Sequence, residues 1–313
     1  MSKLHVSAAP HINSGVSTSN IMRDVAIAML PTAVAAIVLF GLSALWIILV
    51  CVGAAVLSEF AFNFCCKRKQ TVFDFSAVVT GLLLALNLST KVPLWQCAVG
   101  SVFAIIVVKC LFGGLGKNIV NPAIAARVFM LLTFAAVAGG ADPKPIFNID
   151  FASGATPLVS LNEGVNASGT PSLLTLLLGT HGGAIDETCA ITLLLGYAYL
   201  VARKVIKWYV PFAFIATVFV CYLVYSGNVE HALSHVLAGG LLLGAIFMAT
   251  DYVTTPVNNL GRIVFCIGCG LLTFYIRQFG AFPEGVSISI LFMNLFTPII
   301  EKLTTPKTLG GIK

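Results

Sequence analysis

Long runs of apolar residues, separated by short polar stretches, make up most of the chain. Most runs approach the roughly 17–25 apolar residues that cross a bilayer as a helix. The pattern predicts ten transmembrane helices, at about 24–41, 43–63, 73–88, 93–112, 119–138, 185–202, 208–226, 233–250, 261–277 and 284–300. Gly and polar residues interrupt 73–88 and 233–250, which is typical of the broken helices that line cavities in transporters. We therefore expect an all-α polytopic membrane protein.

The basic residues between the runs predict the orientation of the helices. With a cytoplasmic N-terminus, nearly all Lys and Arg lie on the cytoplasmic side, where membrane proteins concentrate them; Lys91, Lys144 and Arg277 are the exceptions. The first 22 residues lack the apolar run of a signal peptide, so we expect them to remain as a tail. This predicts a multi-pass protein of the cytoplasmic (inner) membrane, with tails 1–22 and 302–313 inside and the interval 139–184 outside.

Two pairs of similar stretches indicate an internal repeat. FGGLGKNI at 112–119 aligns without gaps with FGAFPEGV at 279–286, and GLLL occurs at both 81–84 and 240–243. The pairs follow the same order in 23–138 and 185–301, so we expect two five-helix repeats. Because five is an odd number, the second repeat must be inverted in the membrane, and inverted repeats place ligand sites near mid-membrane at their interface.

The composition excludes several functional classes. Of 313 residues, 58% are hydrophobic and 10% charged, which is too apolar for a soluble domain. The net charge of +6 comes from scattered basic residues rather than a basic face, which argues against nucleic-acid binding. Most of the nine cysteines fall inside or beside predicted helices, and the pair Cys266 and Cys269 lacks the other two ligands of a metal or cluster site. We interpret them as packing residues and predict no metal ligands and no catalytic residues.

The polar interval 139–184 contains the motif DFASGAT, from Asp150 to Thr156. A threonine that is to be modified must enter the active site of another enzyme, so it needs an exposed loop and small neighbours. Ser153, Gly154 and Ala155 provide that clearance. Taken alone, the motif is more typical of an ordinary turn, and only its context favours a modification site.

Together with three other stretches, this motif resembles the RnfD/NqrB family of ion-translocating redox complexes. Asp150-x-x-Ser153-Gly154-Ala155-Thr156 is similar to the D-x-x-S/T-G-A-T/S motif at which a flavin transferase attaches FMN. The other stretches are FGGLGKNIVNPA at 112–123 with Arg127, MATDYVTTP at 248–256 with Gly261 and Arg262, and FPEGV at 282–286 with Met293 and Asn294. The short tail and the total length resemble the RnfD branch.

The resemblance implies a cofactor, a reaction and partners. Thr156 would carry FMN through a phosphoester bond, and the chain would serve an ion-translocating ferredoxin:NAD oxidoreductase that moves Na⁺ or H⁺. Its partners would be the other Rnf subunits, including a second covalent-flavin subunit and iron–sulfur subunits, together with the lipid bilayer and the flavin transferase.

The glycine-rich stretch before the fifth predicted helix is a second candidate site. Asn121 followed by Pro122 predicts a helix N-cap, and glycines let the backbone approach a ligand closely. The family resemblance implies that a second, non-covalent flavin (riboflavin) binds near Asn118 and Asn121. Arg127 lies in an apolar helix, where its charge requires a partner such as a flavin or a carboxylate.

Two acids at membrane depth are candidates for an ion path. Glu59 lies in the second predicted helix, and Asp251 follows the eighth, where Thr and Asn residues supply further oxygen atoms. Carboxylates at such positions often bind Na⁺ or a proton, although salt-bridged or interfacial acids occur there too.

The chain contains neither a dinucleotide-binding fingerprint nor a cluster-binding set of cysteines, so it is expected to be an inner link in electron transfer. Two alternatives stay open. One is an NqrB-like subunit that reduces quinone. The other is a secondary transporter or channel without covalent flavin, for which inverted repeats, broken helices and buried acids would suffice.

Overall fold

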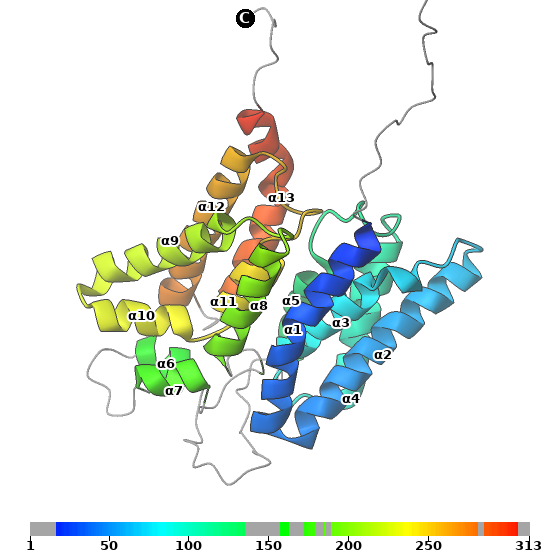
Figure 1. The fold of residues 1–313 in the computed structure, drawn as a ribbon, viewed down its shortest axis with the longest axis horizontal. Helices are drawn as coiled ribbons and strands as arrows, with labels where there is room; N and C mark the ends of the chain where they lie inside the picture. Colours follow the sequence, from blue (N-terminus) through cyan, green and yellow to red (C-terminus); the bar gives the residue numbers. More distant parts are fainter. Residues whose placement is uncertain are drawn as a thin grey trace, which may run out of the picture.

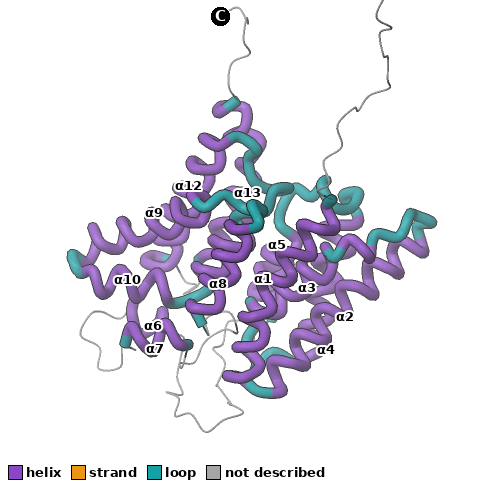
Figure 2. Tube along the Cα trace, viewed as in Figure 1, coloured by secondary structure: helices purple, strands orange, loops and turns teal. Residues whose placement is uncertain are grey.

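The computed structural model describes residues 17–134, 157–162, 172–179, 185, 189–280 and 285–305. All regular elements among these residues are helical (Figure 2). The elements before the long polar interval are α1 Thr18–Phe40, α2 Leu42–Cys65, η1 Val72–Asp74, α3 Ser76–Leu86, α4 Leu94–Val102, η2 Phe103–Cys110 and α5 Pro122–Thr133. Within that interval lie the short helices α6 Pro157–Asn162 and α7 Leu173–Leu178. The elements after it are α8 Ala190–Ala202, α9 Tyr209–Ser226, α10 Val229–Leu237, α11 Leu241–Leu243, η5 Gly244–Met248, α12 Asn259–Phe279 and α13 Val286–Thr304.

Each of the ten apolar segments predicted from the sequence contains a helix, and the chain is a polytopic α-helical membrane protein. By length and composition, five helices of the described part of the chain are able to cross a membrane, namely α1, α2, α9, α12 and α13. A sixth span results if α10 and the α11–η5 segment, which are bent by 69° at the break between them, count as one. This bend confirms the break expected in 233–250. The remaining apolar helices are shorter, so ten crossings stay a prediction.

Capping residues explain where several helices begin and end. The Ser17 side chain accepts a hydrogen bond from the Asn20 N–H at the start of α1, and Asn228 accepts one from Glu230 at the start of α10. Gly41 and Gly227, with φ of 71° and 66°, end α1 and α9 in backbone conformations that side chains disfavour. The helix expected at 73–88 is shorter, because η1 and Phe75, with φ of 59°, precede α3.

The helices form two groups, α1–α5 and α8–α13, that lie side by side (Figure 1). In the first group α2 packs against α3 and α4, and in the second group α9 packs against α10 and α12. The groups meet where α1 packs on α8 and where α5 packs on α13. Gly196 of α8 permits the first of these contacts, since a Cβ atom there would lie 2.5 Å from the carbonyl oxygen of Ala28.

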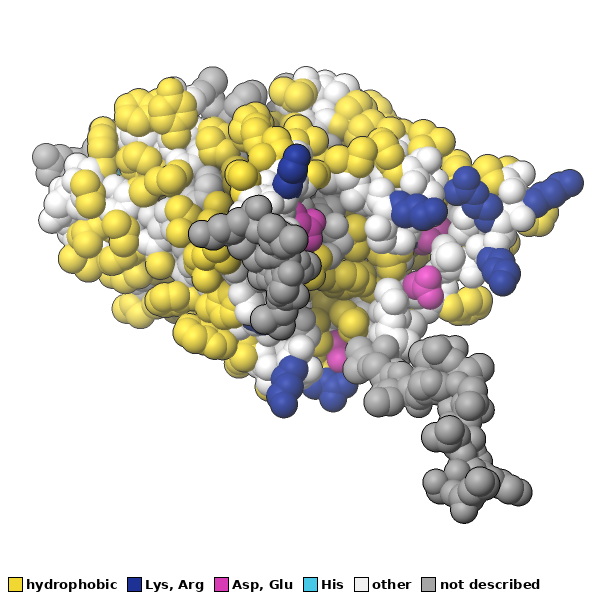
Figure 3. Space-filling model, turned by 90° about the horizontal axis from the view of Figure 1, so that it is seen from above, with side chains coloured by type: hydrophobic (Ala, Val, Ile, Leu, Met, Phe, Trp, Pro, Cys, Tyr) yellow, Lys and Arg dark blue, Asp and Glu magenta, His cyan; other side chains and the backbone are white. Residues whose placement is uncertain are grey.

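The two ends of the molecule differ. The start of α1 and the end of α13 lie at the upper end in Figure 1, whereas α6 and α7 lie at the lower end. Viewed from above, the upper end carries several Lys and Arg side chains (Figure 3). At this end Arg203 of the α8–α9 loop forms an ion pair with Asp24 of α1, with 3.1 Å between Nη2 and Oδ2.

Candidate functional site

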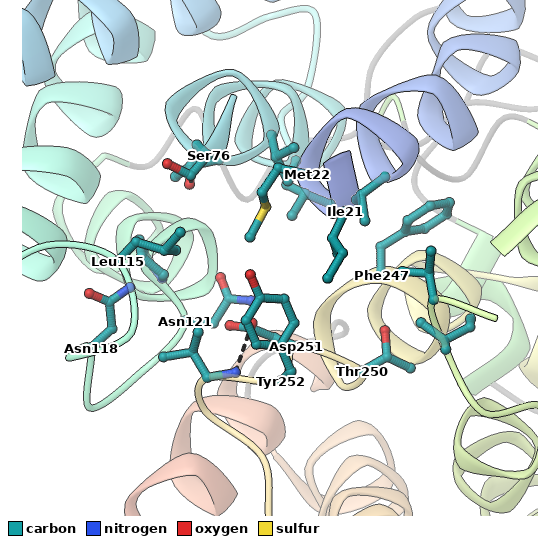
Figure 4. A pocket seen from close by; sticks show the side chains of 18 of the residues that line it. Ile21, Met22, Ser76, Leu115, Asn118, Asn121, Phe247, Thr250, Asp251 and Tyr252 are labelled. Atoms are coloured by element: carbon teal, nitrogen blue, oxygen red, sulfur yellow. Dashed lines mark hydrogen bonds between the residues drawn. The ribbon is translucent and has the colours of Figure 1, made fainter. Parts of the chain in front are cut away.

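A pocket lies between the two helix groups. Its volume is about 740 Å³, including the open space at its mouth. The lining comes from α1, α3, η2 and the loop before α5, and also from the α8–α9 loop, η5 and the segment after it. Figure 4 shows Asp251 and Tyr252 between Asn118 on one side and Phe247 on the other. The pocket thus unites three predicted site residues, Asn118 and Asn121 from the first group and Asp251 from the second.

Asn121 forms the predicted helix cap. Its Oδ1 accepts hydrogen bonds from the backbone N–H groups of Ala123 at 3.0 Å and Ile124 at 3.5 Å, and Pro122 occupies the first helical position. Its own backbone N–H donates to the side-chain oxygen of Asn294 at 3.2 Å. The Asn294 amide nitrogen donates to the Thr254 carbonyl at 3.2 Å. Asn294 of α13 therefore ties the glycine-rich loop to the loop of Asp251.

Asn118 lines the pocket and has a hydrogen-bond acceptor without a partner in the described part of the chain. The side chain is 8% exposed, and its Oδ1 has no hydrogen-bond partner among the described residues. The loop reaches this position through Gly113, Gly114 and Gly116, whose φ angles of 113°, 94° and 90° favour glycine. A buried acceptor without a donor costs free energy, roughly 1–3 kcal/mol, so this atom is suited to a ligand that donates an N–H or O–H.

Asp251 lies in the turn that follows η5, outside the candidate spans. Its Oδ1 accepts from the Val253 N–H and its Oδ2 from the Thr254 hydroxyl, both at 3.2 Å. Burial raises the pKa of this carboxyl, and these two hydrogen bonds act in the opposite direction. A carboxyl in this environment is able to exchange a proton or bind a cation at the edge of the pocket.

Glu59 forms a buried ion pair. The Lys109 Nζ of η2 lies 2.8 Å from its Oε1, and the Thr71 hydroxyl donates to the same oxygen at 2.6 Å. Lys109 also donates to the Ser76 hydroxyl at 2.8 Å, and both Lys109 and Ser76 line the pocket. Glu59 is thus one residue removed from the pocket wall.

Lys109 is a pocket residue that the sequence motifs did not reveal. The charge pattern predicts it among the basic residues of the cytoplasmic side, whereas its side chain is 2% exposed. The available signal was its position within the apolar run 93–112, where an unpaired charge would be unfavourable.

Arg127 is buried in α5 and does not line the pocket. Asp150, Ser153, Gly154, Ala155 and Thr156 lie outside the described residues. The chain resumes at Pro157 with α6, which packs against α10. Leu158 and Leu161 are buried with Ala238 at the break after α10.

Sequence comparisons place the chain among membrane subunits of redox complexes. The model of the NQR2, RnfD, RnfE family matches residues 5–310. The D subunit of the Na(+)-translocating ferredoxin:NAD(+) oxidoreductase complex of Acetobacterium woodii is 43% identical over 99% of this chain and 96% of its own. The D subunit of the proton-translocating ferredoxin:NAD(+) oxidoreductase complex of Clostridium ljungdahlii is 38% identical over 97% and 96%. The D subunit of the ion-translocating oxidoreductase complex of Stutzerimonas stutzeri is 37% identical over 94% and 92%.

Proposed function

Because the chain belongs to the NQR2, RnfD, RnfE family, we propose that it is the flavin-carrying membrane subunit of an Rnf-type complex. The complex would couple electron transfer from reduced ferredoxin to NAD⁺ with movement of Na⁺ or H⁺. Two of the three relatives named above carry ferredoxin:NAD(+) oxidoreductase names, which favours this function over the quinone-reducing alternative. The observation that carries the flavin assignment is the pocket with the unused Asn118 oxygen.

The residues of the pocket fit a non-covalent flavin such as riboflavin. The lining combines apolar side chains with the Phe247 and Tyr252 rings, which suit a flat aromatic ligand. Asn118 Oδ1 would accept a hydrogen bond from an N–H of the ligand, and the Asn121 cap holds the loop in place. An isoalloxazine ring, when bound, supplies one- and two-electron chemistry.

The second flavin of the proposal is FMN, joined through its phosphate to the hydroxyl of Thr156. The support is the Asp150–Thr156 motif and its position in the chain immediately before α6. Helix α6 lies at the lower end of Figure 1, whereas the pocket borders Ile21 and Met22 near the upper end of α1. Flavins at these two places would serve opposite sides of the membrane, as a transmembrane electron path requires.

The proposal includes ten membrane crossings in two inverted five-helix repeats. The packing supports it, because the contacts of α2 with α3 and α4 correspond to those of α9 with α10 and α12. The contacts between the two groups also join equivalent helices. The first helices of the groups, α1 and α8, pack together, and so do the last, α5 and α13. In this arrangement Asp251 and the Glu59–Lys109 pair flank the flavin pocket. Their affinity for Na⁺ or H⁺ would change when the bound flavin is reduced or oxidised.

The covalent flavin is tested by fluorescence in a denaturing gel and by intact mass. The chain is expressed with the flavin transferase, and the wild type is compared with Thr156→Ala and with Thr170→Ala, a matched substitution in the same interval but outside the motif. We expect a fluorescent band with the added mass of FMN for the wild type and for Thr170→Ala, and none for Thr156→Ala. A wild-type chain without FMN would instead favour the transporter alternative.

A further inference from the structure

A second pocket adjoins the first at the basic end of the molecule. Its volume is about 470 Å³, including the open space at its mouth, and it lies between the α8–α9 loop, the loop after η5 and the start of α12. The two pockets share Val205, Ile206, Thr250 and Tyr252 as a common wall. Three cationic side chains line the second pocket, namely those of Lys204, Lys207 and Arg262, and its lining contains no Asp or Glu.

Lys207 and Arg262 are held in place by neutral groups, so their positive charges are not balanced by a carboxylate of the described residues. The Lys207 ammonium donates to the Asn259 side-chain oxygen and lies 5.9 Å from the centre of the Tyr209 ring. Arg262 Nε donates to the Pro256 carbonyl at 3.0 Å. Within the described part of the chain, the ion pairs join Lys109 to Glu59 and Arg203 to Asp24, so the three pocket cations have no carboxylate partner there.

Lys204 occupies a backbone conformation that is typical of glycine. It follows the end of α8 with φ of 57°, and the Val205 N–H donates to the Leu200 carbonyl at 3.0 Å, as in a glycine-terminated helix. A lysine at this position adds a charge to the pocket and accepts backbone strain that glycine would avoid.

The surroundings of the pocket indicate that it lies at the level of lipid headgroups. Trp208, which follows Lys207, is 61% exposed, and Phe212 one turn later in α9 is 62% exposed. Exposed Trp next to Tyr marks the surface of a bilayer in membrane proteins. On α12, Leu260 and Val264 flank Arg262 and are exposed as well. An apolar surface for acyl chains therefore continues from the cationic pocket.

We propose that Lys204, Lys207 and Arg262 bind the phosphate of an anionic phospholipid. Basic pockets at the ends of membrane helices are suited to such headgroups, because the phosphate supplies the missing negative charge. The bound lipid would cover the wall formed by Thr250 and Tyr252 and so close one side of the flavin pocket. A free phosphate ion would suit the same cations, and the experiment separates the two sources.

The test measures lipid binding to the purified complex that contains the full chain. Phosphatidylglycerol and the zwitterionic phosphatidylcholine are titrated in detergent, and bound lipid is counted by native mass spectrometry. The pocket variant is Lys204→Gly with Lys207→Gln. The matched control is Lys67→Gly with Lys69→Gln, which removes two exposed charges outside the pocket, one of them also at a left-handed residue, since Lys67 has φ of 51°. Glycine at 204 and 67 relieves strain, so neither variant should be impaired in folding.

We expect tight binding of phosphatidylglycerol but not phosphatidylcholine to the wild type and to the control. A basic residue near a lipid surface contributes roughly fivefold to binding, so the pocket variant should bind about thirtyfold more weakly. Equal weakening in the control would overturn the proposal, as would equal binding of the two lipids. If inorganic phosphate at the same concentration displaces phosphatidylglycerol, the ligand of this pocket is a free phosphate ion and the lipid proposal is wrong.

Discussion

At the residue scale, Asn118 is the side chain on which the flavin pocket depends most directly. Asn118→Ala removes the buried oxygen that lacks a donor and should weaken binding of the non-covalent flavin about tenfold, since one hydrogen bond is worth roughly 1–1.5 kcal/mol. The measurement is the amount of flavin released from the purified protein on mild denaturation. Asn20→Ala, at an exposed position of α1, is the matched control and should retain its flavin.

A structural explanation would be that Asn118 only shapes the loop. In that case Asn118→Asp, which keeps an acceptor oxygen and the size but replaces the amide nitrogen, would bind flavin no better than Asn118→Ala. If Asn118→Ala binds flavin as tightly as the wild type, the pocket is assigned to another ligand.

The Glu59–Lys109 pair gives a prediction about stability. Both side chains are almost fully buried, so removing one partner leaves an uncompensated charge and should lower the free energy of unfolding by about 3–5 kcal/mol. Glu59→Leu and Lys109→Met should each lower the thermal midpoint, and the double variant should recover part of the loss. The control is Arg203→Gln, because Arg203 is 53% exposed and its ion pair with Asp24 should contribute at most about 1 kcal/mol. Additive effects of the two single variants would contradict a direct pair.

At the scale of elements, the contact between α1 and α8 depends on a glycine. Gly196→Ala would place its Cβ 2.5 Å from the Ala28 carbonyl, so the two helices must separate and the thermal midpoint should fall. Gly53→Ala in α2 is the control, because no atom beyond the local backbone of its own helix lies within 4 Å of the added carbon, and it should leave the midpoint unchanged or raise it slightly. The measurement is thermal unfolding in detergent. Equal midpoints for the two variants would show that the α1–α8 contact is not tight.

Local features of the sequence predicted the helices better than their ends and contacts. The apolar runs located every helix of the two groups, and Asn121-Pro122 located the start of α5, because a cap is a signal within four residues. The sequence could not predict that Lys109 pairs with Glu59 or that Asn294 joins the loops of Asn121 and Asp251. These contacts connect residues far apart in the chain, 50 positions for the ion pair, and only the packing of the helices brings them together.

At the scale of the whole molecule, two helix groups with corresponding contacts enclose a pocket near one end, and α6 lies at the other end. This polarity gives each proposed flavin its own side of the membrane. The lysines and arginines at the pocket end agree with a cytoplasmic location for that end (Figure 3). In the proposed function, electrons start on ferredoxin and end on NAD⁺ in the cytoplasm, so a path through Thr156 would require them to cross the bilayer and return through partner subunits.

The orientation is testable with a membrane-impermeant maleimide on intact cells. One variant retains only Cys65 and Cys66, which are exposed at the end of α2, and a second lacks all nine native cysteines and carries Gly164→Cys. We expect labelling of Gly164→Cys in intact cells and labelling of Cys65 and Cys66 only after the membrane is opened, because the topology predicted from the basic residues assigns the two positions to opposite sides of the membrane. Opened membranes serve as the control for reactivity of both variants. Labelling of Cys65 and Cys66 in intact cells would invert the topology, and the flavin transferase would then have to reach Thr156 from the cytoplasm.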